Sequence, residues 1–255
     1  MVFVIWGWES VKGMIQMYID IHSHCLPNVD DGSDSMEESL DMLRIYQKNR
    51  IDEIIATPHF HYLRGRTAAQ EIRDGTARLQ EAAKQEGLRI RLHAGNEIFY
   101  SHDVPELLAK GEVLTLADSR YALIEFSPME WLKNVREGLY EVMCAGFYPV
   151  LAHAERVLAV VENLKELDAL VEQGVYIQVN VKSAKTEGAR RIRRFVLEAA
   201  SRDMIHFLAT DAHGSRKRIP DIDKDLQYIR KKLGTEFLHR VMCENPEKII
   251  KNETI

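Results

Sequence analysis

The chain has 255 residues, of which 45% are apolar, and it carries a formal net charge of −5 with a pI near 6.1. This length fits one large α/β domain, and the apolar fraction suffices for a sizeable core. The acidic charge argues against a nucleic-acid-binding protein, which would usually be basic. Three scattered cysteines, Cys25, Cys144 and Cys243, indicate reduced thiols in a cytoplasmic protein and not a disulfide framework.

The amino terminus, residues 1–16, precedes the first strand pattern and begins with a short apolar run. The run is too short to span a bilayer, and it lacks the basic segment and small-residue cleavage site of a signal peptide. We therefore expect residues 1–16 to be an appendage without stable membrane insertion, and residues 17–255 to form a single domain. An upstream start codon would explain the appendage, and an interfacial membrane anchor is the alternative.

Apolar runs of strand length alternate with amphipathic runs of helix length. The strand candidates are residues 18–21, 53–57, 90–95, 121–126, 148–152, 175–180 and 205–210. They mostly lack internal alternation, which is typical of parallel strands buried on both faces. Residues 35–49 exemplify the helical runs, since Met36, Leu40 and Leu43 recur at helical spacing. Seven such units predict an α/β fold with a closed or nearly closed parallel barrel, and a doubly wound open sheet is the alternative.

Side chains that bind metals follow these predicted strands at their carboxyl ends, where α/β folds place active sites. The stretch "YIDIHSHCLPNVDDG" (18–32) begins the series. His22 and His24, two residues apart in a strand, share a face and can point at one ion. Asp30 and Asp31 come next. Later strand ends contribute His59, Glu97, Glu125, His153, Asp211 and His213, and two of these segments are followed by Arg156 and Arg218.

Each of these residues alone has an ordinary structural explanation. A lone histidine such as His93 is more often hydrogen-bonded in the core, Asp is a routine helix cap, and arginines commonly form surface ion pairs. The conjunction is stronger evidence, because carboxylates at converging strand ends would repel one another without metal ions. Two divalent ions would only neutralise four carboxylates, whereas three would leave positive charge for an anionic substrate. Mixed imidazole and carboxylate ligands suit Mn, Fe or Zn.

Clustered divalent ions can activate water and stabilise the oxygens of a phosphoester, and a guanidinium can bind phosphate oxygens. The sequence therefore indicates metal-dependent phosphoester hydrolysis, with phosphate binding favoured for Arg156 over Arg218. No cysteine precedes an arginine at the spacing of a cysteine phosphatase, and no G-x-S-x-G, P-loop or Rossmann motif is present. In the stretch 126–136, Phe126, Met129 and Trp131 would line the mouth of the site, and a place in a helix core is the alternative for Trp131.

Eight segments follow one another from Met17 to the end of the chain: "DIHSHCLPNVDDG", "ATPHF", "GNEIFY", "DSRYALIEF", "PVLAHAER", "QVN", "HFLATDAH" and "ENPEKIIKN". This set resembles the polymerase and histidinol phosphatase (PHP) superfamily. More narrowly, it resembles the manganese-dependent protein-tyrosine phosphatases of bacterial capsular and exopolysaccharide operons. The resemblance implies a distorted seven-stranded (β/α) barrel with three divalent ions, Mn first and Fe or Zn as alternatives. It also implies phosphotyrosine hydrolysis by metal-activated water, on the phosphorylated tail of a bacterial tyrosine kinase.

The resemblance implies a role for each residue of the set. It assigns the first metal to His22, His24, Glu97 and Asp211, the second to Glu97, Glu125 and His153, and the third to Asp31, His59 and His213. It assigns phosphate binding to Arg156 and Arg218, and the basic run "GSRKR" leaves Arg216 as an alternative to Arg218. The segment before Met17 has no counterpart in the family.

Three other functions remain open. A metal-dependent amidohydrolase also has H-x-H on its first strand, but it requires a bridging carbamylated lysine. Lys182 falls too late in the strand order for that role and would leave Glu97 and Glu125 unexplained. A histidinol-phosphate or other small-phosphoester phosphatase of the same superfamily would use the same metal site, and a non-enzymatic regulator would bind metal or phosphate without turnover. The oligomeric state is also open, and a homo-oligomer is compatible with the sequence.

Overall fold

The structure, a computed structural model, describes residues 17–61, 65–185 and 189–255. The predicted appendage, residues 1–16, lies outside the described residues, so its separation from the domain stays a prediction. Within the described part of the chain, no helix combines the length and the apolar character needed to cross a membrane.

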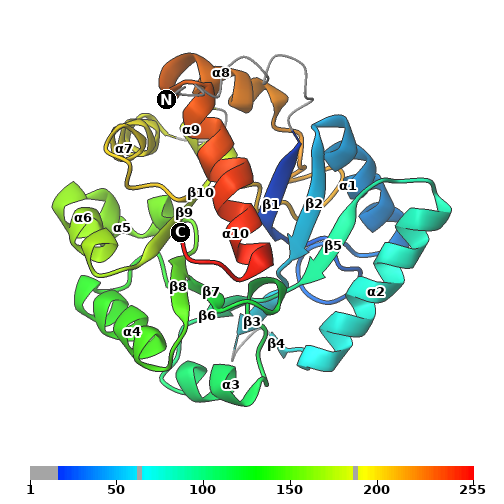
Figure 1. The fold of residues 1–255 in the computed structure, drawn as a ribbon, viewed down its shortest axis with the longest axis horizontal. Coiled ribbons are helices and arrows are strands. Elements are labelled where there is room, and N and C mark those ends of the chain that lie inside the picture. The colour runs from blue at the N-terminus through cyan, green and yellow to red at the C-terminus, as the bar shows by residue number, and fades with distance from the viewer. Residues whose placement is uncertain (1–16, 62–64, 186–188) are drawn as a thin grey trace, which may run out of the picture.

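Strands of two hydrogen-bonded sheets surround a common axis (Figure 1). They are β1 (Tyr18–Ser23), β2 (Ile51–Ala56), β3 (His59–His61), β4 (Gly65–Arg66), β5 (Arg91–Ala94), β6 (Glu97–Phe99), β7 (Tyr121–Glu125), β8 (Tyr148–Leu151), β9 (Tyr176–Asn180) and β10 (Phe207–Ala209). One sheet has the order β1-β2-β5 and the other the order β10-β9-β8-β7-β6-β3-β4. All described pairings are parallel except that of β3 with β4.

The two sheets join into one barrel with seven strand positions. After β2 the chain continues directly into β3, and after β5 into β6, so each of these pairs forms one bent strand that belongs to both sheets. At the other junction, Ser23 and Ala212 form an isolated parallel bridge between β1 and the end of β10. There the His24 N–H donates to the Ala212 carbonyl at 2.9 Å, and the Asp211 N–H donates to the His22 carbonyl at 2.9 Å. The predicted seven-stranded barrel is confirmed, and its distortion lies at these junctions.

Helices surround the barrel, and α10 lies across one end of it (Figure 1). The helices are α1 (Met36–Lys48), α2 (Ala69–Gln85), α3 (Val104–Lys110), α4 (Leu132–Cys144), α5 (Leu158–Val161), α6 (Leu164–Glu172), α7 (Arg190–Ser201), α8 (Asp223–Leu233), α9 (Thr235–His239) and α10 (Asn245–Lys251). The α1 helix begins as its sequence predicts, because the Ser35 side chain caps it by accepting the Glu38 N–H.

The barrel interior is apolar toward the amino ends of the strands. Ile19 of β1, Tyr121 of β7 and Phe207 of β10 are buried there in one cluster, and Ile249 of α10 belongs to the same cluster. A second, larger cluster fills the space between the strands and the surrounding helices. Because apolar side chains and α10 fill the amino-terminal end, the polar residues of the barrel gather at the carboxyl ends of the strands.

We expect a chain that begins at Met17 to keep its fold and activity. Tyr18 is held by its N–H, which donates to the Arg50 carbonyl at 2.7 Å, and every predicted ligand follows it in the sequence. The melting temperature and the rate of aryl phosphate hydrolysis of the shortened chain should match those of the full-length protein. Insolubility or inactivity of the shortened chain would show that residues 1–16 pack on the barrel.

Candidate metal centre

A β-bulge in β1 directs His22 and His24 into the barrel. The pairing of β1 with β2 shifts register between Asp20 and Ser23. Ile21 belongs to the interior cluster, and neighbouring strand residues normally face opposite sides, so an irregularity is needed for His22 to face inward as well. Both histidines are fully buried, and their Nε2 atoms lie 3.3 Å apart. The H-x-H motif therefore presents two imidazoles to one point.

Glu97, the first residue of β6, lies at the centre of the buried cluster and is 1% exposed. Its Oε2 atom is 3.3 Å from Nε2 of His22, 3.3 Å from Nε2 of His24 and 2.9 Å from Nδ1 of His59. Its Oε1 atom is 2.6 Å from Nε2 of His153. One carboxylate thus faces imidazoles from three separate strand ends.

Two further carboxylates flank this centre. Glu125 ends β7, and its oxygens lie 3.8 Å from Nδ1 of His59 and 3.6 Å from Nε2 of His153. Asp211 follows β10 with a φ of 51°, a left-handed conformation that aspartate tolerates better than most residues. Its Oδ1 atom lies 3.5 Å from Nε2 of both His22 and His24. Glu125 therefore lies on the side of His59 and His153, and Asp211 lies on the side of His22 and His24.

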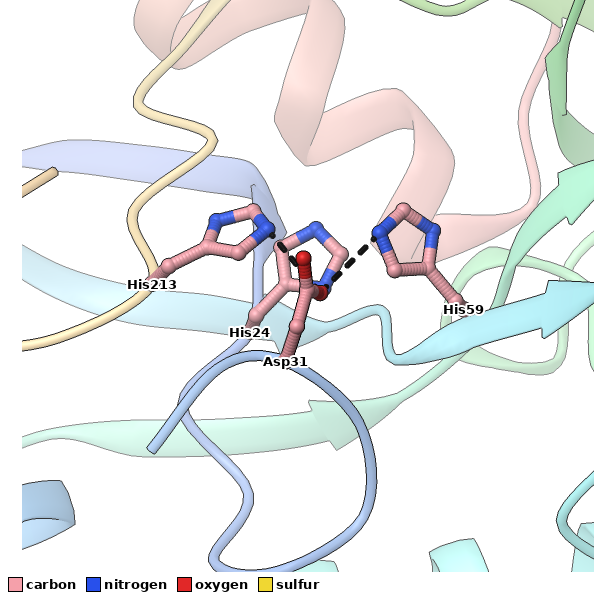
Figure 2. Close-up of side chains that lie close together, drawn as sticks. All are labelled: His24, Asp31, His59 and His213. Atoms are coloured by element: carbon pink, nitrogen blue, oxygen red, sulfur yellow. Dashed lines mark ion pairs between the residues drawn. The ribbon is translucent and has the colours of Figure 1, made fainter. Parts of the chain in front are cut away.

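Asp31 joins the cluster from the loop after β1 (Figure 2). Its Oδ1 atom lies 3.3 Å from Nε2 of His59 and 3.5 Å from Nε2 of His213. The His24 ring is beside that of His213, with centroids 3.8 Å apart. Asp31 is 57% exposed, whereas the three histidines are buried or nearly so. This part of the cluster therefore lies at the mouth of the barrel.

All nine predicted ligands lie in groups compact enough to hold metal ions. In each group one potential ligand atom per residue lies within 4.8 Å of the others: His24, Asp31, His59 and His213; His22, His24 and Asp211; His22, Glu97 and His153; His59, Glu97 and Glu125. Among the described residues, four ligand atoms are buried without a hydrogen-bond partner: His59 Nδ1, Glu97 Oε2, His153 Nδ1 and His213 Nε2. Buried polar atoms are rarely left unsatisfied. These donors and their chemistry fit divalent cations.

The carboxylates attract positive charge into this buried site. Burial opposes a charge on His24, but interactions with Asp211, Asp30 and Glu97 outweigh it and raise the pKa of His24 well above its usual value. Burial likewise opposes a charge on His59, yet Asp31 and Glu97 raise its pKa to about 10. In the absence of metal, protons on His24 and His59 offset part of the carboxylate charge, and divalent cations can take their place.

Both predicted phosphate-binding arginines reach the cluster through Asp211. Arg156 ends the short 3₁₀ helix η2 (Ala154–Arg156), and its guanidinium donates to Asp211 Oδ2 at 2.6 Å. Arg218 donates to the same oxygen at 2.7 Å. Their side chains are 41% and 40% exposed, so each guanidinium also faces the mouth. Arg216, the alternative to Arg218, lines a pocket of about 550 Å³ together with Arg218, Asp31 and His213.

Asp30 is a site residue to which the sequence reasoning assigned no role. Its Oδ2 atom lies 2.6 Å from His24 Nδ1 and accepts the His59 N–H at 2.9 Å, while Oδ1 accepts the Gly32 N–H at 3.0 Å. A carboxylate on the second nitrogen of a ligating imidazole fixes its orientation and increases its basicity. In the sequence, only the adjacent pair Asp30–Asp31 pointed to this role. Asp31 is the predicted ligand, and Asp30 orients the ligand His24.

The amides of β9 form a second set that sequence reasoning left without a role. Gln178 Oε1 lies 3.1 Å from His22 Nδ1 and accepts the His153 N–H at 2.7 Å. Its Nε2 donates to Asn180 Oδ1 at 2.9 Å, and Asn180 Nδ2 donates to Asp211 Oδ2 at 2.9 Å. The strand that supplies no predicted ligand therefore orients three of them. The available signals were two amides at alternate positions of an otherwise apolar strand and their place in the segment "QVN", which is part of the family resemblance.

We expect Cys25→Ala to retain catalytic activity. Burial raises the pKa of the Cys25 thiol to about 12, so the thiolate needed for nucleophilic attack is scarce at neutral pH. The side chain is fully buried in the outer apolar cluster, and its truncation should cost roughly 1 kcal/mol of stability. The melting temperature and kcat on p-nitrophenyl phosphate with Mn²⁺ measure both effects. A folded but inactive variant would contradict water attack.

The closed barrel and its strand-end cluster of imidazoles and carboxylates define a metal-dependent hydrolase of the PHP type. Residues 18–251 match the family model for capsular polysaccharide synthesis proteins CpsB/CapC, and the chain belongs to this family. It is 35% identical to tyrosine-protein phosphatase CpsB of Streptococcus pneumoniae over 93% of this chain and 100% of that protein. It is 33% identical to tyrosine-protein phosphatase YwqE of Bacillus subtilis over 93% of each chain.

Solved structures agree with this assignment. The structural study of YwqE from B. subtilis and CpsB from S. pneumoniae, described as unique metal-dependent tyrosine phosphatases, includes a chain that matches with a TM-score of 0.87 and 32% identity, over 93% of this chain and 96% of that one. The phosphotriesterase homology protein of Escherichia coli, at 12% identity and a TM-score of 0.62, shares the fold. The chain is accordingly a metal-dependent tyrosine-protein phosphatase linked to capsular polysaccharide synthesis.

The amidohydrolase alternative required a lysine among the metal ligands. Lys182 follows β9 in a 3₁₀ turn, and its Nζ donates to the Ile219 carbonyl at 2.7 Å. The middle strand end, that of β7, carries Glu125. An amidohydrolase of Mycoplasma synoviae shares the barrel at 12% identity and a TM-score of 0.60, which is a likeness of fold alone.

Proposed function

We propose that the cluster holds three divalent cations, Mn²⁺ first and Fe or Zn as alternatives, and that the enzyme dephosphorylates the tyrosine-rich tail of a capsule-linked tyrosine kinase in the cytoplasm. Glu97 carries the proposal, because its carboxylate faces four imidazoles and joins the groups of ligands into one centre. The proposed sets are those that the family resemblance implies, and the short distances within them support the proposal: His22, His24, Glu97 and Asp211; Glu97, Glu125 and His153; and Asp31, His59 and His213. The free thiols of Cys25 and Cys144 support the cytoplasmic location.

The cations would supply activation of water and neutralisation of charge on the phosphate oxygens. The protein residues bind and orient the substrate. Arg156 and Arg218 converge on one oxygen of Asp211, and their remaining N–H groups can donate to phosphate oxygens at the mouth. Asp30 and Gln178 hold His24 and His22 in fixed ring orientations. Such preorganised charges stabilise a transition state without reorganising during the reaction.

A phenolate leaving group suits this arrangement. The pKa of free tyrosine is about 10, so its oxygen departs more readily than the alkoxide of serine or of histidinol. A strong general acid is therefore less important for phosphotyrosine than for an alkyl phosphate. A site dominated by positive charge and metal ligands favours the aryl ester.

Exposed apolar side chains near the site fit a peptide substrate. Trp131 is 78% exposed and Met129 is 74% exposed, which excludes the helix-core alternative for Trp131. The segment that carries them is tied to the Arg156 segment, since the Leu158 N–H donates to the Pro128 carbonyl at 3.0 Å. Phe126 differs from the mouth-lining prediction, because it is 4% exposed and stacks on Tyr100 within the core.

We expect phosphotyrosine peptides to be cleaved with a much higher kcat/KM than phosphoserine peptides or histidinol phosphate. The comparison uses the three substrates with the Mn²⁺-loaded full-length enzyme. The aryl leaving group and the exposed segment of Met129 and Trp131 both favour the first substrate. A preference for histidinol phosphate would assign the enzyme a small-phosphoester substrate with the metal site unchanged.

The variant Trp131→Ala tests how much the exposed segment of Met129 and Trp131 contributes to the preference for phosphotyrosine peptides, separately from the leaving group. KM for a phosphotyrosine peptide should rise several-fold, with a smaller change for p-nitrophenyl phosphate, which has no flanking chain. Tyr140→Ala is the matched control, because Tyr140 is 64% exposed on α4 and lies nine residues after Trp131 in the sequence. If both substitutions change KM for the peptide equally, Trp131 has no specific role in peptide binding.

A further inference from the structure

A buried polar network lies at the junction where β1 and β10 close the barrel. Tyr46 of α1 reaches this junction, and its hydroxyl oxygen lies 2.9 Å from Asp20 Oδ2, 2.7 Å from Ser23 Oγ and 2.8 Å from Thr210 Oγ1. Asp20, Ser23 and Tyr46 are fully buried, and Thr210 is 7% exposed. The helical spacing of α1 makes Tyr46 part of its apolar face, but its hydroxyl serves the polar network.

Asp20 is the acceptor that unites the two strands. Its Oδ1 atom accepts the Thr210 N–H of the β10 side at 3.0 Å and the His22 N–H of its own strand at 3.4 Å. Its Oδ2 atom accepts the hydroxyls of Tyr46 and Thr210. A buried carboxylate without hydrogen bonds would be very unfavourable, so these four donors are what permit Asp20 to occupy this position.

The network coincides with the two backbone irregularities that aim the ligands. The β-bulge that turns His22 and His24 inward lies between Asp20 and Ser23. On the other side of the junction, Thr210 Oγ1 accepts the Ala212 N–H at 3.2 Å. This hydrogen bond joins the two neighbours of Asp211, whose backbone is in the left-handed conformation. The strand ends are joined here by one isolated bridge and two backbone hydrogen bonds, and the side-chain network adds to these few contacts in holding the ends in register.

We propose that Tyr46, Asp20 and Thr210 are positioning residues that set the geometry of the ligand group His22, His24 and Asp211. The Tyr46 hydroxyl is hydrogen-bonded to Asp20, Ser23 and Thr210, and it acts on the three ligands through the backbone that carries them. The inference rests on the proposed function, because it concerns metal binding by that same group. Loss of positioning should weaken metal binding even when the fold is retained.

Mn²⁺ titration of the metal-stripped full-length chain by calorimetry tests this role. Tyr46→Phe keeps the ring in the core and removes only the hydroxyl. We expect its Mn²⁺ affinity to fall by about tenfold or more, the range found when partners behind metal ligands are removed. The Mn²⁺ concentration for half-maximal hydrolysis of p-nitrophenyl phosphate should rise in parallel.

Tyr121→Phe is the matched control. Tyr121 is also fully buried, and its hydroxyl donates to the Glu253 carbonyl at 2.9 Å near the opposite end of the barrel. This variant should lose stability without a change in Mn²⁺ affinity. If Tyr46→Phe lowers the melting temperature as Tyr121→Phe does but binds Mn²⁺ like the wild type, the network is structural only and the proposal fails.

A second pair of variants keeps the test decisive if Tyr46→Phe does not fold. Thr210→Val removes the hydroxyl with little change of shape and should weaken Mn²⁺ binding, whereas Thr210→Ser restores the hydroxyl and should recover most of the affinity. Equal affinities for the two variants would overturn the proposal. Failure of the wild-type chain to bind Mn²⁺ would instead refute the proposed metal centre itself, so the two failures are distinguishable.

Discussion

Removal of divalent metal should abolish hydrolysis of phosphotyrosine, and Mn²⁺ should restore it. The nine predicted ligands converge at the carboxyl ends of the strands, and four buried nitrogen or oxygen atoms among them lack any hydrogen-bond partner in the described part of the chain. Metal ions contribute several kcal/mol of transition-state stabilisation, which corresponds to a loss of about a thousandfold or more in rate. The measurement is kcat on a phosphotyrosine peptide after prolonged dialysis against EDTA.

Readdition of metal and a fold probe serve as the controls. Activity should return with Mn²⁺ and not with Ca²⁺, because Ca²⁺ prefers sites made of oxygen ligands and this cluster is rich in imidazole. Circular dichroism should show that the stripped chain keeps its secondary structure, since protonated imidazoles can still pair with the carboxylates. Full activity in the presence of excess EDTA would refute the metal-dependent mechanism.

Glu97→Gln should cause the largest loss among single substitutions at the site. Burial would raise the pKa of Glu97, but the charge of His22 and the hydrogen bond with His153 outweigh it and hold the pKa well below its usual range. Glutamine keeps the shape and removes the negative charge that faces these imidazoles. Because the loss of groups behind metal ligands already costs about 10- to 100-fold, we expect kcat to fall by at least about 100-fold and the bound metal to decrease.

Glu53→Gln is the matched control for this substitution. Glu53 is also a buried glutamate, 6% exposed, and its Oε1 lies 2.7 Å from His93 Nε2 on the β2–β5 side of the barrel. This variant should lose stability but keep its metal content and kcat. Wild-type metal content and turnover in Glu97→Gln would show that Glu97 is not a ligand. Elemental analysis of both purified variants gives the metal content.

The sequence determined the barrel and the composition of its site. Apolar strands without alternation predict parallel strands buried on both faces, and parallel strands in a barrel bring their carboxyl ends together. For this reason the sequence alone assigns His22, Glu97 and Asp211, which are far apart along the chain, to one cluster. The same reasoning assigned His93 to a structural role, and it forms an ion pair with Glu53 away from the cluster. The sequence pattern was enough to predict the ligands, because a parallel barrel always brings the carboxyl ends of its strands together.

Only the tertiary structure decided which side chains support the ligands and which reach the mouth. The hydrogen bond between Tyr46 and Thr210 joins residues 164 positions apart, and Tyr46 has the same helical spacing as the apolar residues of α1. Gln178 and Asp30 act through contacts across the barrel or around a tight loop, which no periodicity records. Phe126 turns into the core while Trp131 is exposed. Such partners depend on exact distances between separate elements, because hydrogen bonds form only over about 3 Å, whereas sequence patterns specify only which face of an element is buried.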